Sequence, residues 1–198
     1  MKSFFILFLV FLISSTSFGQ LYLKYSEIED KDIIDALAFS GIGIYKFEID
    51  SLIEKHNFYL IIDEFAGKDN LIKSDTLFGL NPFQIPSEEV SKIRFITKVV
   101  NNLYDKVSLY ISTPHFSTWK EIEIDKKYRR KHYWIEFEKS QNKINTKIPL
   151  LFFGSEWDDI YNGQMTTRFC SRDKMELDLS GDAINMIPHF YIIYYLIK

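Results

Sequence analysis

The sequence predicts a mainly β protein: a single antiparallel β-sandwich of nine or ten short strands, with one N-terminal helix near residues 27–39. Three observations favour this fold class. Apolar and polar residues alternate over most of the chain after residue 44, turn residues separate the alternating runs, and no helical pattern recurs between them. Short strands without intervening helices are typical of sandwiches rather than of β–α–β units.

The composition is that of a folded globular domain. Of the 198 residues, 46% are hydrophobic and 26% are charged, which excludes disorder, collagen and coiled coil. Cys170 is the only cysteine, so disulfide frameworks and multi-thiolate metal sites are excluded, and we expect a buried, inert thiol. The net charge of −3 gives no reason to expect nucleic acid as a partner.

The first residues form a secretory signal pattern. Lys2 precedes an uncharged apolar run at 4–13, and the small residues Ser17 and Gly19 stand before Gln20. A permanent anchor would need about 20 apolar residues, so we expect cleavage between Gly19 and Gln20. The prediction is a cleaved signal peptide at 1–19 and a single β-sandwich-like domain at 20–198. We expect the product to be soluble, periplasmic or secreted, with no transmembrane span after processing.

The expected helix near 27–39 has recognisable start and stop signals. Ser26 and Glu29 have the spacing of a capping box. Glycines after the apolar positions of this segment should end the helix, at Gly41 and Gly43. A second, short helical turn is predicted at about 51–56, with Asp50 or Ser51 as its cap.

The remaining elements are predicted as strands. Residues 59–65 and 71–78 form a hairpin around the turn at 66–70, and a loop with Pro82 and Pro86 follows it. Alternation predicts further strands through Tyr45/Phe47/Ile49, Ile93/Phe95/Thr97, Val107/Leu109/Ile111, Ile122/Ile124, Tyr133/Ile135/Phe137, Ile148/Leu150/Phe152 and Met175/Leu177/Leu179, and the apolar run 190–197 closes the chain.

Motifs for catalysis or metal binding are weak. The histidines lack the i, i+2 or i, i+4 spacing of metal ligands, so we expect no metal and no cofactor; they are His56, His115, His132 and His189. Asp63 and Glu64 are adjacent on a predicted strand, so their side chains should point to opposite faces. The stretch 158–163 resembles a calcium loop but lacks its alternating ligands, and we expect a solvated turn there.

Trp134 is a candidate contact residue on one of the predicted strands. If Tyr133, Ile135 and Phe137 face the core, His132 and Trp134 face outward on the same strand. An outward tryptophan is either a flat platform for a sugar or a side chain, or it lies under a loop or a second sheet.

A basic cluster is the strongest candidate site. Five cations occur within six residues in a chain of negative net charge: Lys126, Lys127, Arg129, Arg130 and Lys131, with Tyr128 among them. We expect residues 126–131 to form a hairpin tip between strands through Ile124 and Tyr133, either as a solvated turn or as an anion-binding tip. In the second case Arg129 and Arg130 would hold phosphate or carboxylate, and Tyr128, His132 and Trp134 would contact a sugar or partner.

These observations favour an exported, non-enzymatic binding module of the bacterial envelope. Its partner would be an anionic envelope lipid or glycan, or another envelope protein. The alternative is a small hydrolase with a His/carboxylate site assembled from separate loops, with Asp158, Asp159, His115 or His189 as first suspects.

Overall fold

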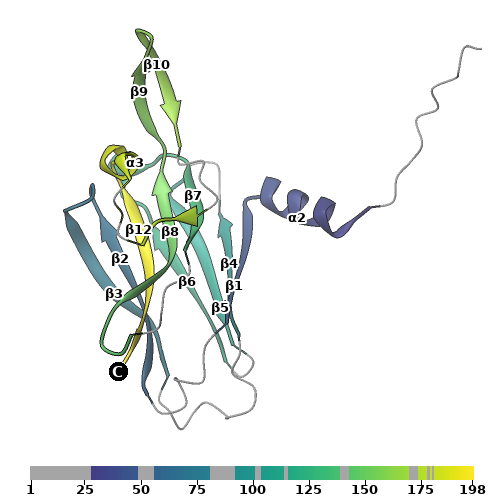
Figure 1. Ribbon diagram of the computed structural model, residues 1–198. Helices are drawn as coiled ribbons and strands as arrows, with labels where there is room; N and C mark the ends of the chain where they lie inside the picture. Colours follow the sequence, from purple (N-terminus) through teal and green to yellow (C-terminus); the bar gives the residue numbers. More distant parts are fainter. Residues whose placement is uncertain are drawn as a thin grey trace, which may run out of the picture. The chain divides into compact units, whose positions relative to one another are not determined.

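A computed structural model describes residues 28–48, 56–80, 92–100, 104–113, 116–138, 143–169, 174–177, 179 and 181–198 (Figure 1). The chain divides into two compact units, residues 1–35 and 36–198. The expected short helix at 51–56 and the proposed cleavage site at Gly19 and Gln20 lie mostly or wholly outside the described residues, as do His115 and Cys170.

The predicted fold class is confirmed, since the described part of the chain is mainly β and largely antiparallel. Its strands form sheets of four, six and two strands. In chain order the elements are α2 (Asp30–Phe39), β1 (Ile42–Glu48), β2 (Phe58–Phe65), β3 (Leu71–Leu80), β4 (Lys92–Val99), β5 (Lys106–Ser112), β6 (Ser117–Glu123), the 3-10 turn η3 (Lys126–Tyr128), β7 (His132–Phe137), β8 (Ile148–Ser155), β9 (Trp157–Tyr161), β10 (Gln164–Arg168), β11 (Lys174–Met175), α3 (Asp182–Met186) and β12 (Phe190–Ile197).

The predicted helix is present as α2, and none of its residues is buried. At its start the Glu29 N–H donates to the Asp32 carboxylate at 2.8 Å, which satisfies one of the free amides of the first turn. At its end Gly41 has a φ of +73°, the left-handed conformation that commonly terminates helices.

The four-stranded sheet has the order β1-β4-β5-β6 and is antiparallel throughout. The alternation predicted for β4 and β5 is confirmed, because every second side chain is buried: Ile93, Phe95 and Thr97, and Val107, Leu109 and Ile111. The opposite side chains of these strands are mostly exposed or half-buried.

The six-stranded sheet has the order β11-β7-β8-β12-β2-β3. It contains the predicted hairpin of β2 and β3, and the last strand of the chain, β12, lies between β8 and β2. Both faces of its central strands are covered, whereas most of the edge strand β3 is exposed. One face packs on the four-stranded sheet, with a shared core that includes Leu60, Phe95, Leu109 and Phe153. The other face carries a second cluster that includes Phe152 of β8, Met175 of β11 and Ile184 of α3.

One prediction about strand pairing is wrong. The strands β6 and β7 do not form a hairpin: β6 is an edge of the four-stranded sheet, whereas β7 belongs to the six-stranded sheet. Residues 124–131 are therefore the crossover between the two layers. The stretch 158–163, expected as a solvated turn, is largely exposed, but only its end is the turn: residues 158–161 are paired in the hairpin β9–β10, whose two-residue turn has positive φ at Asn162 and Gly163.

Candidate functional site

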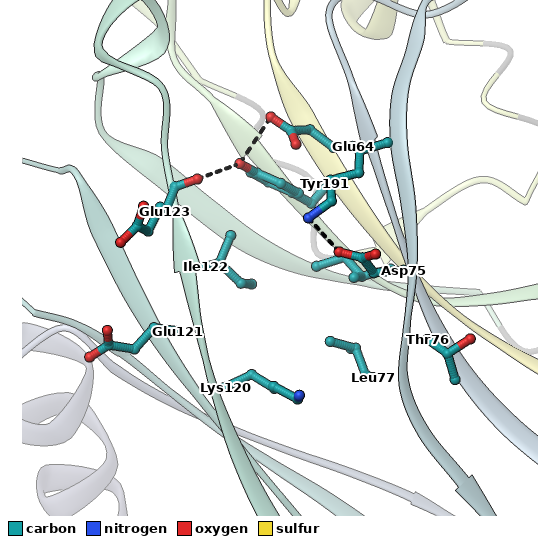
Figure 2. A pocket seen from close by; sticks show the side chains of 11 residues that line it. Glu64, Asp75, Thr76, Leu77, Lys120, Glu121, Ile122, Glu123 and Tyr191 are labelled. Atoms are coloured by element: carbon teal, nitrogen blue, oxygen red, sulfur yellow. Dashed lines mark hydrogen bonds and ion pairs between the residues drawn. The ribbon is translucent and has the colours of Figure 1, made fainter.

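A pocket of about 480 Å³ opens where the edge strands β3 and β6 of the two sheets approach each other (Figure 2). Its walls include the apolar side chains of Ile62, Leu77 and Ile122. Charged groups surround these, and carboxylates outnumber cations among the lining residues: Glu64, Asp75, Glu121 and Glu123 against Lys73 and Lys120. The pocket is therefore acidic, and its chemistry does not suit an anionic ligand.

Tyr191 and Glu64 form the polar wall of this pocket. The Tyr191 hydroxyl lies 3.3 Å from Glu64 Oε1 and 3.2 Å from the Glu123 carbonyl oxygen (Figure 2). One hydroxyl carries one proton, so it donates to one of these acceptors at a time. Burial and the neighbouring carboxylate of Glu64 raise the pKa of Tyr191, which keeps the phenol protonated.

A buried chain of hydrogen bonds continues from Glu64 into the protein. His189 Nε2 lies 3.0 Å from Glu64 Oε1, and His189 Nδ1 lies 3.3 Å from His132 Nε2. His132 Nδ1 in turn lies 2.8 Å from the Arg130 carbonyl oxygen. Burial lowers the pKa of His132 to about 4 and also lowers the pKa of His189, although the Glu64 carboxylate opposes the second shift.

The hydrogen-bond chain ends in an acceptor on both sides, which limits how many of its contacts two neutral imidazoles can complete. Three contacts join the Arg130 carbonyl, His132, His189 and the Glu64 carboxylate, and each contact needs one proton. Two neutral imidazoles carry only two N–H groups. Two neutral imidazoles therefore complete two of the three contacts, and the third lacks a proton.

This arrangement does not place an imidazole at the pocket surface. The His189 side chain is fully buried, and no histidine is among the described residues that line the pocket. The suspected carboxylates have other partners, since Asp158 pairs with Arg130 at 2.8 Å and Asp159 with Arg168 at 2.6 Å. Within the described residues there is also no group of three side chains that could hold a metal ion.

The sequence reasoning did not identify Glu64 as the partner of His189. It did predict that Asp63 and Glu64 point to opposite faces, and this is confirmed: Asp63 contacts Lys147, while Glu64 lines the pocket. A usable signal was present, because Glu64 continues the core-facing alternation of Leu60 and Ile62. A carboxylate at such a position must find a buried partner.

The basic cluster lies on the crossover and is held there by four contacts. The Asp125 carboxylate accepts the Lys127 N–H at 3.0 Å, and the Tyr128 ring stacks on His189 with centroids 4.1 Å apart. Arg130 binds Asp158, and the Lys131 carbonyl accepts the Glu156 N–H at 2.9 Å. The backbone of residues 125–131 is therefore tied to both β9 and the buried histidines.

The other four cationic side chains of the cluster are exposed: Lys126, Lys127, Arg129 and Lys131. None of them forms an ion pair with a carboxylate in the described ranges. The ammonium of Lys127 lies over the Tyr128 ring, and that of Lys131 lies over the Tyr133 ring. We name these four side chains the basic patch.

Two residues predicted to contact a ligand lie inside the protein instead. His132 is buried, and Trp134 stacks on Phe153 with centroids 4.3 Å apart in the core between the sheets. The second of the two expectations for Trp134, that it lies under another sheet, is the one the structure shows. Ile135 and Phe137 do face a core, but it is the second cluster on the far side of the six-stranded sheet.

Together, the fold and these sites define a two-layer β-sandwich domain with an acidic pocket between its sheet edges and a basic patch on the crossover between its layers. The chain belongs to the family described as Domain of unknown function (DUF5041), which matches residues 12–198. Neither the curated proteins nor the solved structures include a significant match. Among the described residues, no helix has the length and apolarity to span a membrane.

Proposed function

We propose that this protein is an exported, non-enzymatic binding module that holds an anionic group of an envelope component on its basic patch. The observation that supports this most directly is the combination of exposure and anchoring in residues 125–131. Four cations face solvent without acidic partners in the described part of the chain, while Tyr128 and Arg130 attach the segment to the protein.

Electrostatics explains why this arrangement favours a ligand. Neighbouring cations repel one another, and a bound phosphate or carboxylate relieves that repulsion. Arg129 can donate two parallel hydrogen bonds to such a group, and the lysines add attraction without fixed geometry. Because the backbone is already held, little conformational entropy is lost when the anion binds.

The lining of the pocket argues against the hydrolase alternative. Its described lining contains neither a histidine nor a serine or cysteine nucleophile, and the imidazole nearest to it is covered by Tyr128 and Tyr191. The hydrolase alternative needs an imidazole and a carboxylate that both reach a substrate.

Export is part of the proposal and rests on the segment 1–19. We expect the mature chain to begin at Gln20, because Ser17 and Gly19 provide the small residues that signal peptidase cleavage requires. Intact mass of the protein recovered outside the cytoplasm tests this. A product that retains residues 1–19 in the membrane fraction would contradict it.

The binding proposal is tested with dextran sulfate, a soluble polyanion, at low salt. Changing Lys126, Lys127, Arg129 and Lys131 together to Gln should weaken binding about thirtyfold, because four modest attractions to the polyanion are lost at once. Arg130 is left in place because it pairs with Asp158.

A charge-matched control separates the patch from net charge. Four other exposed lysines are changed to Gln in the control variant: Lys46, Lys92, Lys98 and Lys143. This control should bind almost as the parent does, and parental binding should decrease steeply between low salt and 0.15 M. Equal loss in both variants, or no binding by the parent, would overturn the proposal.

A further inference from the structure

The hairpin β9–β10 exposes large apolar side chains that no part of the core explains. Ile160 is 74% exposed and Met165 is 79% exposed, and the two residues are directly paired across the strands. Tyr161, beside the turn, is 60% exposed. Single exposed apolar residues are ordinary. A cross-strand pair near the end of a hairpin is different, because its two side chains lie side by side and form one apolar surface.

The hairpin is a separate two-stranded sheet that continues from the end of β8 (Figure 1). Asn162 and Gly163 both have positive φ, which is the geometry of the tight hairpin turn that matches strand twist. At its base Arg168 binds Asp159, and Asp158 accepts from Thr167 and Arg130. The apolar end is therefore presented on a braced element.

The register places the apolar pair on the face of the hairpin that Arg130 contacts. Side chains two residues apart on a strand share a face, so Ile160 lies on the face of Asp158. Asp158 is bound by Arg130, which belongs to the segment that carries the basic patch. Two residues along a strand correspond to roughly 7 Å, so the apolar pair extends about that far beyond the ion pair.

A second apolar group adjoins the patch at the base of the hairpin. Phe169, directly after β10, is 50% exposed and stacks on Tyr133 with centroids 4.8 Å apart. The ammonium of Lys131 lies 5.1 Å from the centroid of the same Tyr133 ring. Rings next to cations are suited to the interface between headgroups and acyl chains.

We propose that the β9–β10 hairpin inserts Ile160 and Met165 into the surface of an anionic lipid bilayer while the basic patch contacts its headgroups. This inference rests on the proposed function and narrows the anionic partner to a lipid surface. The basic patch complements the negative charge of anionic headgroups. The reach of the apolar pair, roughly 7 Å beyond the ion pair, matches the depth of about 5–10 Å to which interfacial elements bury their apolar face in the headgroup and acyl boundary.

Other occupants fit less well. An acidic glycan would use the cations but gives no role to the apolar pair. A second copy of the chain would need about 800 Å² of surface on each partner for a stable dimer, which a single hairpin face does not offer. Binding to an anionic bilayer requires only an apolar contact and several cations, and this surface combines both.

The test measures cosedimentation with phosphatidylcholine vesicles that contain or lack phosphatidylglycerol. Changing Ile160 and Met165 together to Ser should weaken binding to the anionic vesicles roughly tenfold and leave dextran sulfate binding unchanged. Thr166→Ala, on the opposite face of the same hairpin, should bind as the parent does. All proteins keep the same N-terminus, so any contribution of residues 1–27 cancels.

Insertion is measured directly with Ile160→Trp. All three wild-type tryptophans are changed to Phe only if their emission obscures the signal; otherwise the difference from the parent is used. A blue shift on anionic vesicles, and quenching by lipids brominated on their acyl chains, supports insertion. Thermal unfolding of each variant confirms that the exposed substitutions leave the fold intact.

The remaining outcomes overturn the inference in distinguishable ways. If the Ser variant binds vesicles like the parent, or the parent binds dextran sulfate but no vesicles, the lipid proposal fails and the basic patch stands. If the parent binds neither probe, both proposals fail. Self-association that the Ser variant abolishes, without vesicle binding, assigns the hairpin to a contact between copies instead.

Discussion

Asp63 is a buried carboxylate whose charge is balanced by a single lysine. It is 5% exposed, and its two oxygens accept from Lys147 Nζ at 3.0 and 2.8 Å, with Ser74 Oγ at 2.5 Å. Removing the cation leaves the carboxylate desolvated and without its counter-charge. The free energy of unfolding then falls by more than the lost ion-pair attraction alone, because an unpaired charge stays buried.

We therefore expect Lys147→Met to lower the free energy of unfolding by about 2–3 kcal/mol, somewhat less than for a fully buried pair because the ammonium partly reaches water. Lys73→Met is the matched control, since Lys73 pairs with Asp75 on the exposed side of β3. That substitution should leave the free energy of unfolding nearly unchanged, because an exposed ion pair contributes little. Urea unfolding of both variants measures the difference, and equal effects would contradict this view of Asp63.

His132 should make stability depend on pH. Burial lowers its pKa from 6.5 to about 4, so between these values the unfolded chain binds a proton that the folded chain does not. Stability is therefore complete above pH 6.5 and decreases as the pH falls toward 4, by up to about 3 kcal/mol.

The variant His132→Asn isolates this effect, because the amide keeps an N–H near the position of Nδ1. Its free energy of unfolding should fall less steeply with decreasing pH between 6.5 and 4.5 than that of the parent. The comparison of slopes removes any constant loss of stability. Parallel pH profiles would mean that other groups cause the dependence.

At the scale of elements, the sequence predicted strands better than it predicted their partners. Alternation identified β4 and β5 because each has one buried face. It could not show that both faces of β7 are covered, Trp134 by one core and Ile135 by the other. Whether two successive strands form a hairpin or cross between sheets depends on contacts far away in the sequence, which alternation does not contain.

The candidate site was likewise predictable only where it has a local sequence signal. The basic cluster is visible in the sequence as a run of charge, whereas the Glu64–His189–His132 chain joins three strands or their ends and has no local signature. The hairpin β9–β10 did have one, since Asn162-Gly163 is a strong turn signal that the likeness to a calcium loop obscured.

The anchoring of the crossover by Tyr128 gives a prediction at this scale. Tyr128→Ala removes the ring that stacks on His189 but none of the cations. In this variant the segment has to become ordered as the anion binds, and this ordering weakens binding. We expect dextran sulfate affinity to fall about fivefold, with roughly 1 kcal/mol as the ordering cost of a short segment. Titration at several salt concentrations should give the parental salt dependence, because the charge is unchanged.

Tyr128→Phe is the control for this prediction. It keeps the ring and should bind nearly as the parent does. If the Phe variant loses as much affinity as the Ala variant, the hydroxyl rather than the stacking is responsible. If neither loses affinity, the segment does not depend on this anchor.

For the whole molecule, the decisive contact is between the ends of the main unit. The final strand β12 pairs with β2, more than a hundred residues earlier, and with β8 on its other side. Its odd-numbered side chains Tyr191, Ile193 and Ile197 enter the core between the sheets, and its even-numbered ones Phe190 and Ile192 enter the second cluster. Neither core can be completed before the last residues of the chain arrive.

Deleting residues 190–198 should therefore abolish cooperative unfolding, because β2 and β8 lose their shared partner and both cores lose apolar residues. The truncated chain should show no thermal transition by circular dichroism and should be cleaved rapidly by trypsin. Ile193→Ala is a milder change, with an expected loss of about 2–5 kcal/mol in the free energy of unfolding.

Replacing residues 158–167 of the exposed hairpin with two glycines is the contrasting deletion of similar length. That variant should keep a cooperative transition, because the hairpin contributes only Trp157, outside the deleted segment, to the second cluster. A cooperative transition in the chain without β12 would show that the two layers fold without their central strand.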